Sequence, residues 1–260
     1  MKDEGFLNRF ILQWFPTLAV AILGLTIWHL TVRVLGLKVG VLPAPIDVYH
    51  AAIEYRTELA TGLLSTGIAA AVGLITAITA GSLISVAFSQ SRRIRIAFFP
   101  YVMFLQTVPI VAIAPLLIIW SGYEFRTVVI VTVIVCLFPI INNVTAGLTA
   151  IDKQWSDLFQ LYGATRPKRL ARLQVPAAVP YLIIGAKTSA GLAVIGAIVA
   201  DFFVGNGTAY KGLGTLMTGW IAFSKTAPMI AAVFASTLLG LFLFGSVHLV
   251  SRTLLRRWMP

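Results

Sequence analysis

Residues 127–151 read TVVIVTVIVCLFPIINNVTAGLTAI and contain no charged side chain. A helix needs about 20 such residues to cross the hydrocarbon core of a bilayer. Long apolar runs without two-residue alternation favour helices over a β-barrel, because backbone groups in lipid must bond to one another. Five more windows share this character, the last interrupted only by Lys187: 10–32, 59–91, 96–123, 226–251 and 173–200. The sequence therefore predicts an all-α, polytopic membrane protein with about six transmembrane helices.

The composition supports a membrane protein and excludes most soluble enzymes. Of the 260 residues, 58% are hydrophobic and 11% are charged, and the mean hydropathy is +0.91. A soluble domain carries about 25% charged residues. The single cysteine, Cys136, cannot form a disulfide within the chain, and His29, His50 and His248 are too far apart to suggest a metal site. We expect one transmembrane domain over residues 1–260, with no metal and no cofactor bound by the chain.

The distribution of basic residues predicts the orientation. With the N-terminus in the cytoplasm, 13 of the 20 basic residues face inward and 6 face outward, with Lys187 in the membrane. This bias satisfies the positive-inside rule and places both termini in the cytoplasm. The window 10–32 is too long for a signal peptide and is read as an uncleaved anchor. Because topology explains the net charge of +11, no nucleic-acid partner is expected.

The connection at about 151–176 differs from the others. It carries five basic and two acidic residues among apolar positions whose spacing favours one or two short amphipathic helices. Gly163 indicates a turn within the segment, and Pro176 and Pro180 precede the main part of the next window. Loops of this kind often rest on lipid headgroups. The defined stops favour instead a cytoplasmic projection that docks into a groove on a soluble partner.

Residues 155–194, WSDLFQLYGATRPKRLARLQVPAAVPYLIIGAKTSAGLAV, resemble the cytoplasmic loop of permease subunits of bacterial ABC importers. The family pattern is E-A-A, three residues, G, nine residues, I-x-L-P. The positions that match its acidic residue, its glycine and its final tetrad are Asp157, Gly163 and residues 173–176. The resemblance implies that this loop couples the chain to a separate ATPase. The coupling residues would be Asp157, Leu158, Phe159, Gly163, Ala164, Thr165, Arg166 and Pro176.

The chain departs from the family pattern at two positions, because Leu158 and Phe159 stand where the family has alanines. Three further stretches resemble the subgroup that imports nitrate, sulfonates, taurine, bicarbonate and thiamine precursors. They are LPAPIDV at 42–48, VPIVAIAPLLIIWSGYE at 108–124 and GLGTL at 212–216. The expected substrate is a small anion or small organic solute of these types.

The resemblance also implies an assembly. The chain would have the type I ABC importer permease fold and lie in the inner membrane of a prokaryote. It would pair with a second permease copy, as a homodimer, to form the translocation pathway. An extracytoplasmic binding protein would deliver solute, and the partner ATPase would use ATP and Mg²⁺. The chain itself is not expected to be an enzyme, since the nearest match to a phosphate-binding loop, at 219–226, has Ser224 in place of its second glycine.

Polar residues in the apolar windows, or directly after one, are candidates for lining a pathway: Gln106, Asn142, Lys187 and, just beyond the window 173–200, Asp201. Lys187 and Asp201 would lie about 21 Å apart along one helix and cannot pair within it. In the alternative interpretation they are structural: Lys187 caps carbonyls or meets a neighbouring carboxylate, and Asp201 reaches water at the outer end. Pro109 and Pro115 would bend the third span.

Small residues recur at every fourth position in two windows, which predicts close helix packing within the subunit or between two copies. They are Ser65, Ala69, Gly73, Ala77 and Gly81, and then Ser189, Ala193 and Ala197. Two other functions stay open at this stage. A stand-alone secondary transporter would use an ion gradient and usually shows internal repeats, and a lipid-modifying enzyme would need clustered acids, a nucleophile or metal ligands.

Overall fold

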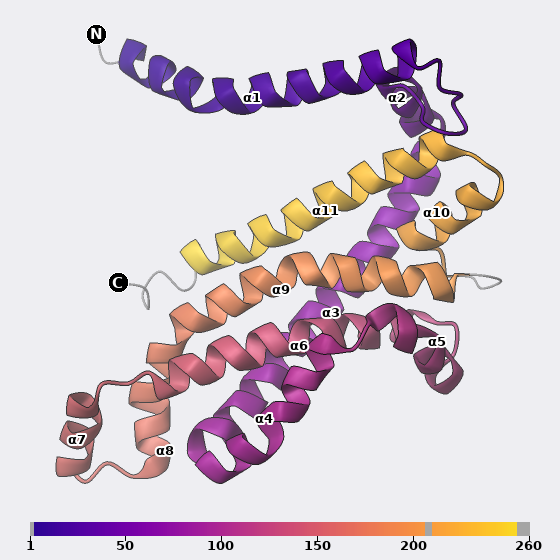
Figure 1. Ribbon diagram of the computed structural model, residues 1–260. Coiled ribbons are helices and arrows are strands. Elements are labelled where there is room, and N and C mark those ends of the chain that lie inside the picture. Colours follow the sequence, from indigo (N-terminus) through magenta and orange to yellow (C-terminus); the bar gives the residue numbers. More distant parts are fainter. Residues whose placement is uncertain (1–2, 206–209, 254–260) are drawn as a thin grey trace.

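The computed structural model describes residues 3–205 and 210–253, with side chains from residue 15 onward, and the described residues form helices and connecting turns (Figure 1). Five helices are long and apolar enough to cross a membrane. They are α1 (Asp3–Val34), α3 (Arg56–Gln90), α6 (Phe125–Thr149), α9 (Val175–Val204) and α11 (Thr226–Thr253). These helices confirm five of the six predicted windows.

The remaining window, 96–123, is not the single continuous helix that its composition suggests. It forms α4 (Arg92–Thr107) and α5 (Ile110–Ser121), whose axes are bent by 101°. The break falls at Val108 and Pro109, which are both extended, and α5 begins at the next residue. A proline disfavours helical backbone at the residue before it and provides no N–H for the helix, so the chain turns here. The two helices together form the sixth candidate span.

Five shorter elements connect the spans. They are α2 (Pro45–Glu54), α7 (Lys153–Leu161), α8 (Arg166–Arg169), the π-helical turn η1 (Leu170–Gln174) and α10 (Leu213–Ala222). In Figure 1, α2 and α10 lie at one end of the molecule, which we call the α2–α10 end. The elements α7 and α8, the start of α1 and the end of α11 lie at the opposite end, called the α7–α8 end. Helices α7 and α8 confirm the expected short helices, whereas α2 and α10 fall in connections for which only turns were expected.

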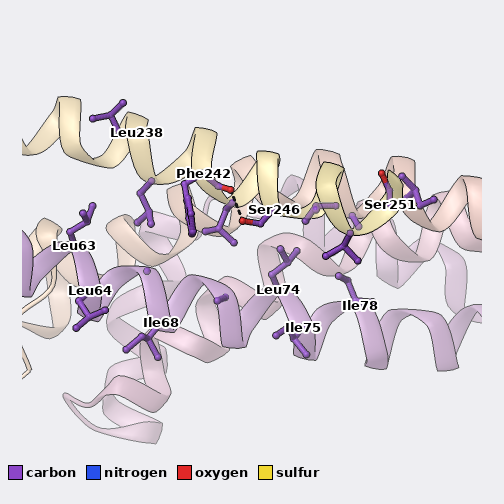
Figure 2. Close-up of a pocket in the computed structure, with 18 of the residues that line it drawn as sticks. Leu63, Leu64, Ile68, Leu74, Ile75, Ile78, Leu238, Phe242, Ser246 and Ser251 are labelled. Carbon is purple, nitrogen blue, oxygen red and sulfur yellow. Dashed lines mark hydrogen bonds between the residues drawn. The ribbon is translucent and has the colours of Figure 1, made fainter. Parts of the chain in front are cut away.

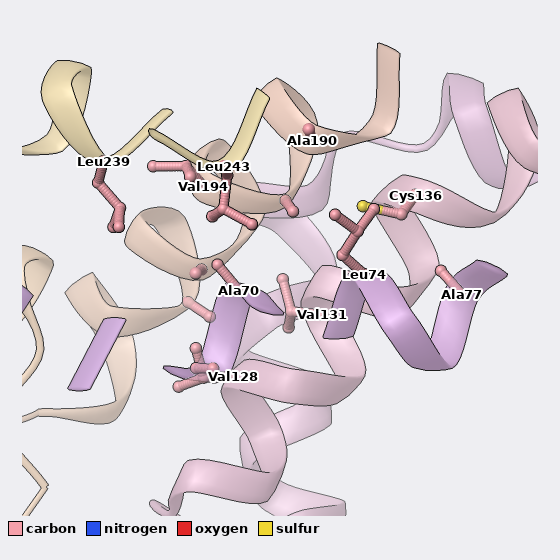
Figure 3. Close-up of a cluster of buried hydrophobic side chains, with 14 of the residues drawn as sticks. Ala70, Leu74, Ala77, Val128, Val131, Cys136, Ala190, Val194, Leu239 and Leu243 are labelled. Carbon is pink, nitrogen blue, oxygen red and sulfur yellow. The ribbon is translucent and has the colours of Figure 1, made fainter. Parts of the chain in front are cut away.

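The core forms where α3, α6 and α9 pack against one another, with side chains such as Ala70, Val131 and Val194 facing inward (Figure 3). Small residues set the helix spacing. A Cβ on Gly73 would lie 2.5 Å from Thr132 Cγ2, and one on Gly81 would lie 2.7 Å from Ile140 Cγ2. Such contacts require glycine on α3, so its small-residue stripe packs against α6 within the subunit.

The second stripe also packs inside the subunit. Ser189 on α9 donates to the carbonyl of Cys136 on α6 at 3.1 Å, and the Cys136 thiol donates to the carbonyl of Ser189 at 3.4 Å. Ala193 and Ala197 are fully buried beside them. Both hydrogen bonds join backbone to side chain between adjacent helices, which satisfies polar atoms that lipid could not.

An apolar groove of about 1180 Å³ runs between α3, α9 and α11 (Figure 2). Leu64 and Ile68 on α3 and Phe242 on α11 are among its lining residues. The Ser246 hydroxyl in this groove donates to the Phe242 carbonyl of its own helix at 2.8 Å. The walls therefore offer a polar solute little to bind, and we do not place the translocation pathway here.

Helix α1 stands apart from the core and approaches α11 only towards the α2–α10 end in Figure 1. Only 6% of its candidate span is buried. Its main anchor is Trp28, whose indole N–H donates to the Pro43 carbonyl at 3.1 Å and whose ring stacks on Phe234 with centroids 6.2 Å apart. From Phe15 onward, α1 otherwise presents an apolar surface suited to lipid or to another membrane helix.

Candidate functional site

The α7–α8 end carries the predicted coupling loop as a projection. No residue of α7 is buried, and Leu161 and Tyr162 at its end are 83% and 82% exposed. Trp155 and Leu158 are exposed on the same helix. Grouped apolar side chains on a projection favour binding to another surface, because water solvates them poorly.

Gly163 ends α7 with a Schellman motif. Its φ of +67° lies in the left-handed region, which side chains with a Cβ rarely adopt. The Gly163 N–H donates to the Gln160 carbonyl at 2.9 Å, and the Ala164 N–H donates to the Phe159 carbonyl at 2.9 Å. These are the two hydrogen bonds of the Schellman motif, and the left-handed backbone that the motif needs explains why the residue is glycine. A Cβ here would meet no atom within 4 Å, so space is not the constraint.

The second arm of the loop continues into the membrane. After Thr165, α8, η1 and α9 follow without interruption, and they count as one candidate span of 39 residues from Arg166 to Val204. The π-helical turn ends two residues before Pro176, which has no N–H to donate to the preceding helical turn. Pro176 thus lies inside an uninterrupted helical segment in which α8 turns away from the line of α9 (Figure 1).

The eight predicted coupling residues lie on this loop, but they do not form one bonded cluster. Asp157, Leu158, Gly163, Thr165 and Arg166 are exposed. Three others are half-buried: Phe159, Ala164 and Pro176. Within the described part of the chain, neither Asp157 nor Arg166 forms an ion pair. Leu158 and Phe159, which are larger than the alanines of the family pattern, lie within an intact α7. The sequence analysis did not identify Leu161, one of the most exposed apolar side chains of the loop.

At the α2–α10 end, a buried carboxylate joins three elements. Asp201, near the end of α9, has an exposed fraction of 0%. Its Oδ2 accepts from Thr66 Oγ1 on α3 at 2.7 Å and from the Gly214 N–H on α10 at 3.4 Å. Its Oδ1 accepts from the Tyr210 hydroxyl at 2.9 Å. We call Asp201, Thr66, Tyr210 and Gly214 the Asp201 cluster. The structural interpretation in which Asp201 reaches water is therefore wrong.

The cluster caps the start of α10. Thr66 Oγ1 accepts the Leu213 N–H at 2.8 Å while donating to Asp201. Two of the first N–H groups of α10, which lack partners inside the helix, are thus bonded to α3 and α9. A carboxylate is also electrostatically favoured at a helix N-terminus. Burial, followed by the nearby Asp201 charge, raises the pKa of Tyr210, so its hydroxyl stays protonated and donates.

The cluster explains the glycines of the stretch at 212–216. A Cβ on Gly212 would lie 2.0 Å from Asp201 Oδ2, and one on Gly214 would lie 2.4 Å from the Ile198 carbonyl oxygen. Both positions need glycine so that α10 can approach α9. The sequence reading identified Asp201 but missed Thr66 and Tyr210. The sequence does carry one signal of this close packing, because several glycines, including Gly212 and Gly214, follow Asp201.

A second contact ties the same end together. Lys225, in the turn before α11, donates to the Tyr55 hydroxyl at 2.9 Å and lies 5.2 Å from the centre of its ring. The hydrogen bond to Tyr55 raises the pKa of Lys225, which keeps the ammonium group charged. Thr226 donates to the Val39 carbonyl in the α1–α2 connection.

The other candidate polar residues do not meet one another. Gln106, near the end of α4, and Asn142, on α6, are exposed. Lys187 is half-buried and has no hydrogen-bond or ion-pair partner among the described residues. The alternative in which it caps carbonyls or meets a carboxylate is therefore not seen among these residues. The neighbouring Asn143 donates to the Pro139 carbonyl at 2.8 Å, which satisfies a backbone group near a proline inside α6.

Comparison with known proteins gives consistent matches. The family model described as "Binding-protein-dependent transport system inner membrane component" matches residues 73–256. A formylaminopyrimidine transport permease protein of Halalkalibacterium halodurans is 32% identical, over 92% of this chain and 94% of that protein. A putative aliphatic sulfonates transport permease protein of Bacillus subtilis is 24% identical, over 94% and 87%. A nitrate import permease protein of Synechococcus elongatus is 24% identical, over 88% and 85%.

These matches agree with the apolar helices and with the loop at the α7–α8 end, and they give no support to a stand-alone secondary transporter. Proteins of this family are transport permeases, and ATP hydrolysis is not their own activity. The chain belongs to the family of inner-membrane components of binding-protein-dependent transport systems, the permease subunits of ABC importers.

Proposed function

We propose that this permease couples solute passage to a separate ATPase that binds the α7–α8 end, which faces the cytoplasm. Family membership implies both an ATPase and an extracytoplasmic binding protein as partners. In this arrangement the binding protein meets the α2–α10 end, and the ATPase holds ATP and Mg²⁺. A second copy of the chain completes the pathway as a homodimer.

One observation carries the proposal: the exposed apolar end of α7 projects away from the packed helices (Figure 1). Leu161 and Tyr162 are held there by a helix that ends at a defined turn, so little ordering is needed when a partner binds. An apolar helical face of this kind fits a groove on a soluble protein.

The uninterrupted helical segment from α8 to α9 offers a route for the coupling. The 39 residues from Arg166 to Val204 include Asp201, so this segment links the loop to the Asp201 cluster. When the ATPase moves α8, α9 moves with it, and the hydrogen bonds of Asp201 make α3 and α10 follow. The permease would thus change shape by shifts of packed helices rather than by local unfolding.

The test measures ATPase binding to the tagged full chain, produced together with the transport proteins of its host. Polypeptides that bind azido-ATP are quantified per mole of permease after purification. We expect the double variant Leu161→Glu and Tyr162→Glu to retain at least tenfold less of the labelled polypeptide, because both charges would have to be desolvated at the contact.

Phe223→Glu is the matched control, since Phe223 is 78% exposed but lies in the turn after α10, at the opposite end. It should retain the ATPase as the wild type does. Equal retention by the double variant and the wild type would exclude α7 as the ATPase contact.

For the substrate, we propose a small organic solute or anion of the kinds carried by the relatives. The formylaminopyrimidine permease shares 32% identity over nearly the full length, so a formylaminopyrimidine is the first compound to test. Reconstituted transporter with its binding protein should take it up in an ATP-dependent manner. Uptake of nitrate or an alkanesulfonate in its place would assign the chain to the chemistry of those relatives instead.

A further inference from the structure

Helix α10 is too short to cross the membrane, yet it packs against three of the spans, α3, α9 and α11. Its ten residues rise about 15 Å, roughly half of the hydrocarbon core. Buried Leu213, Met217 and Trp220 belong to one cluster of apolar side chains with residues of α2, α3 and α11. The Trp220 ring also meets the Tyr55 ring edge-on, with centroids 5.6 Å apart. Helix α10 therefore joins the elements of the α2–α10 end to one another.

The contact between α10 and α9 leaves no room for one helix to slide along the other. A Cβ on Gly214 would lie 2.6 Å from Asp201 Cβ and 3.1 Å from the Phe202 backbone nitrogen, and one on Gly205 would collide with the Thr215 side chain. Thr215 Oγ1 donates to the Asp201 carbonyl at 3.0 Å, in addition to the bond between the Gly214 N–H and the Asp201 carboxylate. Close-packed interfaces of this kind transmit displacement, because they are hard to compress. A shift of α10 is therefore passed to α9.

The exposed turn after α10 is fixed to that helix by its backbone. The Lys225 N–H donates to the Trp220 carbonyl at 2.8 Å, and the Ser224 N–H donates to the Ile221 carbonyl at 2.9 Å. Phe223 in this turn is 78% exposed. A protein that docks on the α2–α10 end can thus move α10 through a turn that is bonded to it.

We propose that α10 passes the docking of the binding protein to α9, with Asp201 as the positioning residue that keeps the two helices engaged. This inference rests on the proposed function, in which the binding protein meets the α2–α10 end and the ATPase binds the opposite end of the α8–α9 segment. The two partners are then coupled in free energy. Nucleotide bound by the ATPase changes the affinity for the binding protein, and the binding protein changes the affinity for nucleotide by the same factor.

The test measures the affinity of the reconstituted permease–ATPase complex for the binding protein, with and without the ATP analogue AMP-PNP and Mg²⁺. The binding protein is loaded with a formylaminopyrimidine, or with nitrate or an alkanesulfonate if that solute gives uptake. We expect the analogue to change the wild-type Kd by about fivefold or more. Asp201→Leu has a side chain of similar size that accepts no hydrogen bond. It should reduce the nucleotide effect to less than about twofold and leave the nucleotide-free Kd within about twofold of wild type.

Asp201→Asn is the conservative variant. Its carbonyl oxygen can accept from Thr66 and Gly214 while its amide group donates to the Tyr210 hydroxyl, so most of the nucleotide effect should remain. Ser189→Ala is the matched control on α9, since it removes a buried hydroxyl that bonds to α6 and does not touch α10. It should show the full nucleotide effect. If Asp201→Leu does not assemble, Thr215→Val replaces it, because that variant removes only the bond to the Asp201 carbonyl and should weaken the effect.

An unchanged nucleotide effect in Asp201→Leu, or in Thr215→Val where it replaces that variant, would overturn the proposal. Equal loss in Asp201→Asn would show that the retained hydrogen bonds do not matter, and equal loss in Ser189→Ala would assign the effect to lower stability; both results also overturn it. A nucleotide-free Kd about tenfold weaker in Asp201→Leu would place the residue in the docking surface instead. Absence of the ATPase from the wild-type complex is a distinct result that contradicts the proposed function.

Discussion

The two ends of the molecule use polar and apolar side chains in opposite ways. At the α2–α10 end, Asp201 is buried and accepts hydrogen bonds from Thr66, Tyr210 and Gly214. At the α7–α8 end, apolar side chains such as Leu161 and cations such as Arg172 are exposed and lack partners in the described chain. The first end holds its shape with bonds made inside the subunit, and the second leaves surfaces for other molecules to cover. Substitutions of similar chemistry should therefore have unequal effects at the two ends.

The largest effect is expected for Gly214→Ala. The added Cβ would lie 2.4 Å from the Ile198 carbonyl oxygen, which belongs to the backbone of α9 and cannot move without displacing the helix. We expect a loss of about 3 kcal/mol in the free energy of unfolding, measured by denaturant titration in detergent. Gly219→Ala is the control on the same helix, because its Cβ would meet nothing within 4 Å. Equal stability of the two variants would contradict the close approach of α10 to α9.

The second largest loss of stability is expected when the buried carboxylate of Asp201 is removed. Asp201→Ala removes the buried carboxylate that accepts from Thr66, Tyr210 and the Gly214 N–H, which should cost about 2 kcal/mol of stability. Asp157→Ala removes an exposed carboxylate at the other end and should change stability by less than about 0.5 kcal/mol. Thermal unfolding of the two variants in the same detergent measures the difference. A neutral Asp201→Ala variant would show that the cluster does not hold α10.

Much of this organisation could be predicted from local sequence. Continuous apolar runs predicted the five long helices, because membrane spans are defined by length and the absence of charge. The spacing around Gly163 likewise predicted where the projecting helix ends. Both features depend on residues that are close together in sequence.

The features that were missed depend on distant residues or on backbone direction. Thr66 and Asp201 are 135 residues apart, and nothing near Thr66 distinguishes it from other threonines in apolar helices. A bend at Pro109 was expected, but its size of 101° was not: a proline in an apolar run can kink a helix slightly or break it, and neighbouring helices decide which. The buried position of Asp201 follows from the approach of α10, which composition alone did not reveal.

A moderate and local effect is expected at Gly163. A β-branched side chain is disfavoured at φ +67°, so Gly163→Val should destabilise the end of α7 by about 1 kcal/mol. Asn tolerates this backbone region, and Gly163→Asn should retain most of the local stability. Amide hydrogen exchange of α7 measures the change, and exchange in α3, α6 and α9 should stay the same. If the valine variant slowed refolding of the whole chain or destabilised those helices, the loop would not be an independent projection.

The smallest effect is expected for Leu161→Ala, and it makes the comparison between the two ends most direct. Leu161 is 83% exposed, so its truncation should change the free energy of unfolding by less than about 0.5 kcal/mol. Leu213→Ala, at a fully buried leucine in the cap of α10, should cost about 3 kcal/mol. The order should reverse when ATPase retention is measured, because a side chain that is free in the isolated subunit gains its contacts only in the complex. A destabilising Leu161→Ala would mean that α7 packs against its own subunit, and the surface proposed for the ATPase would then be part of the permease core.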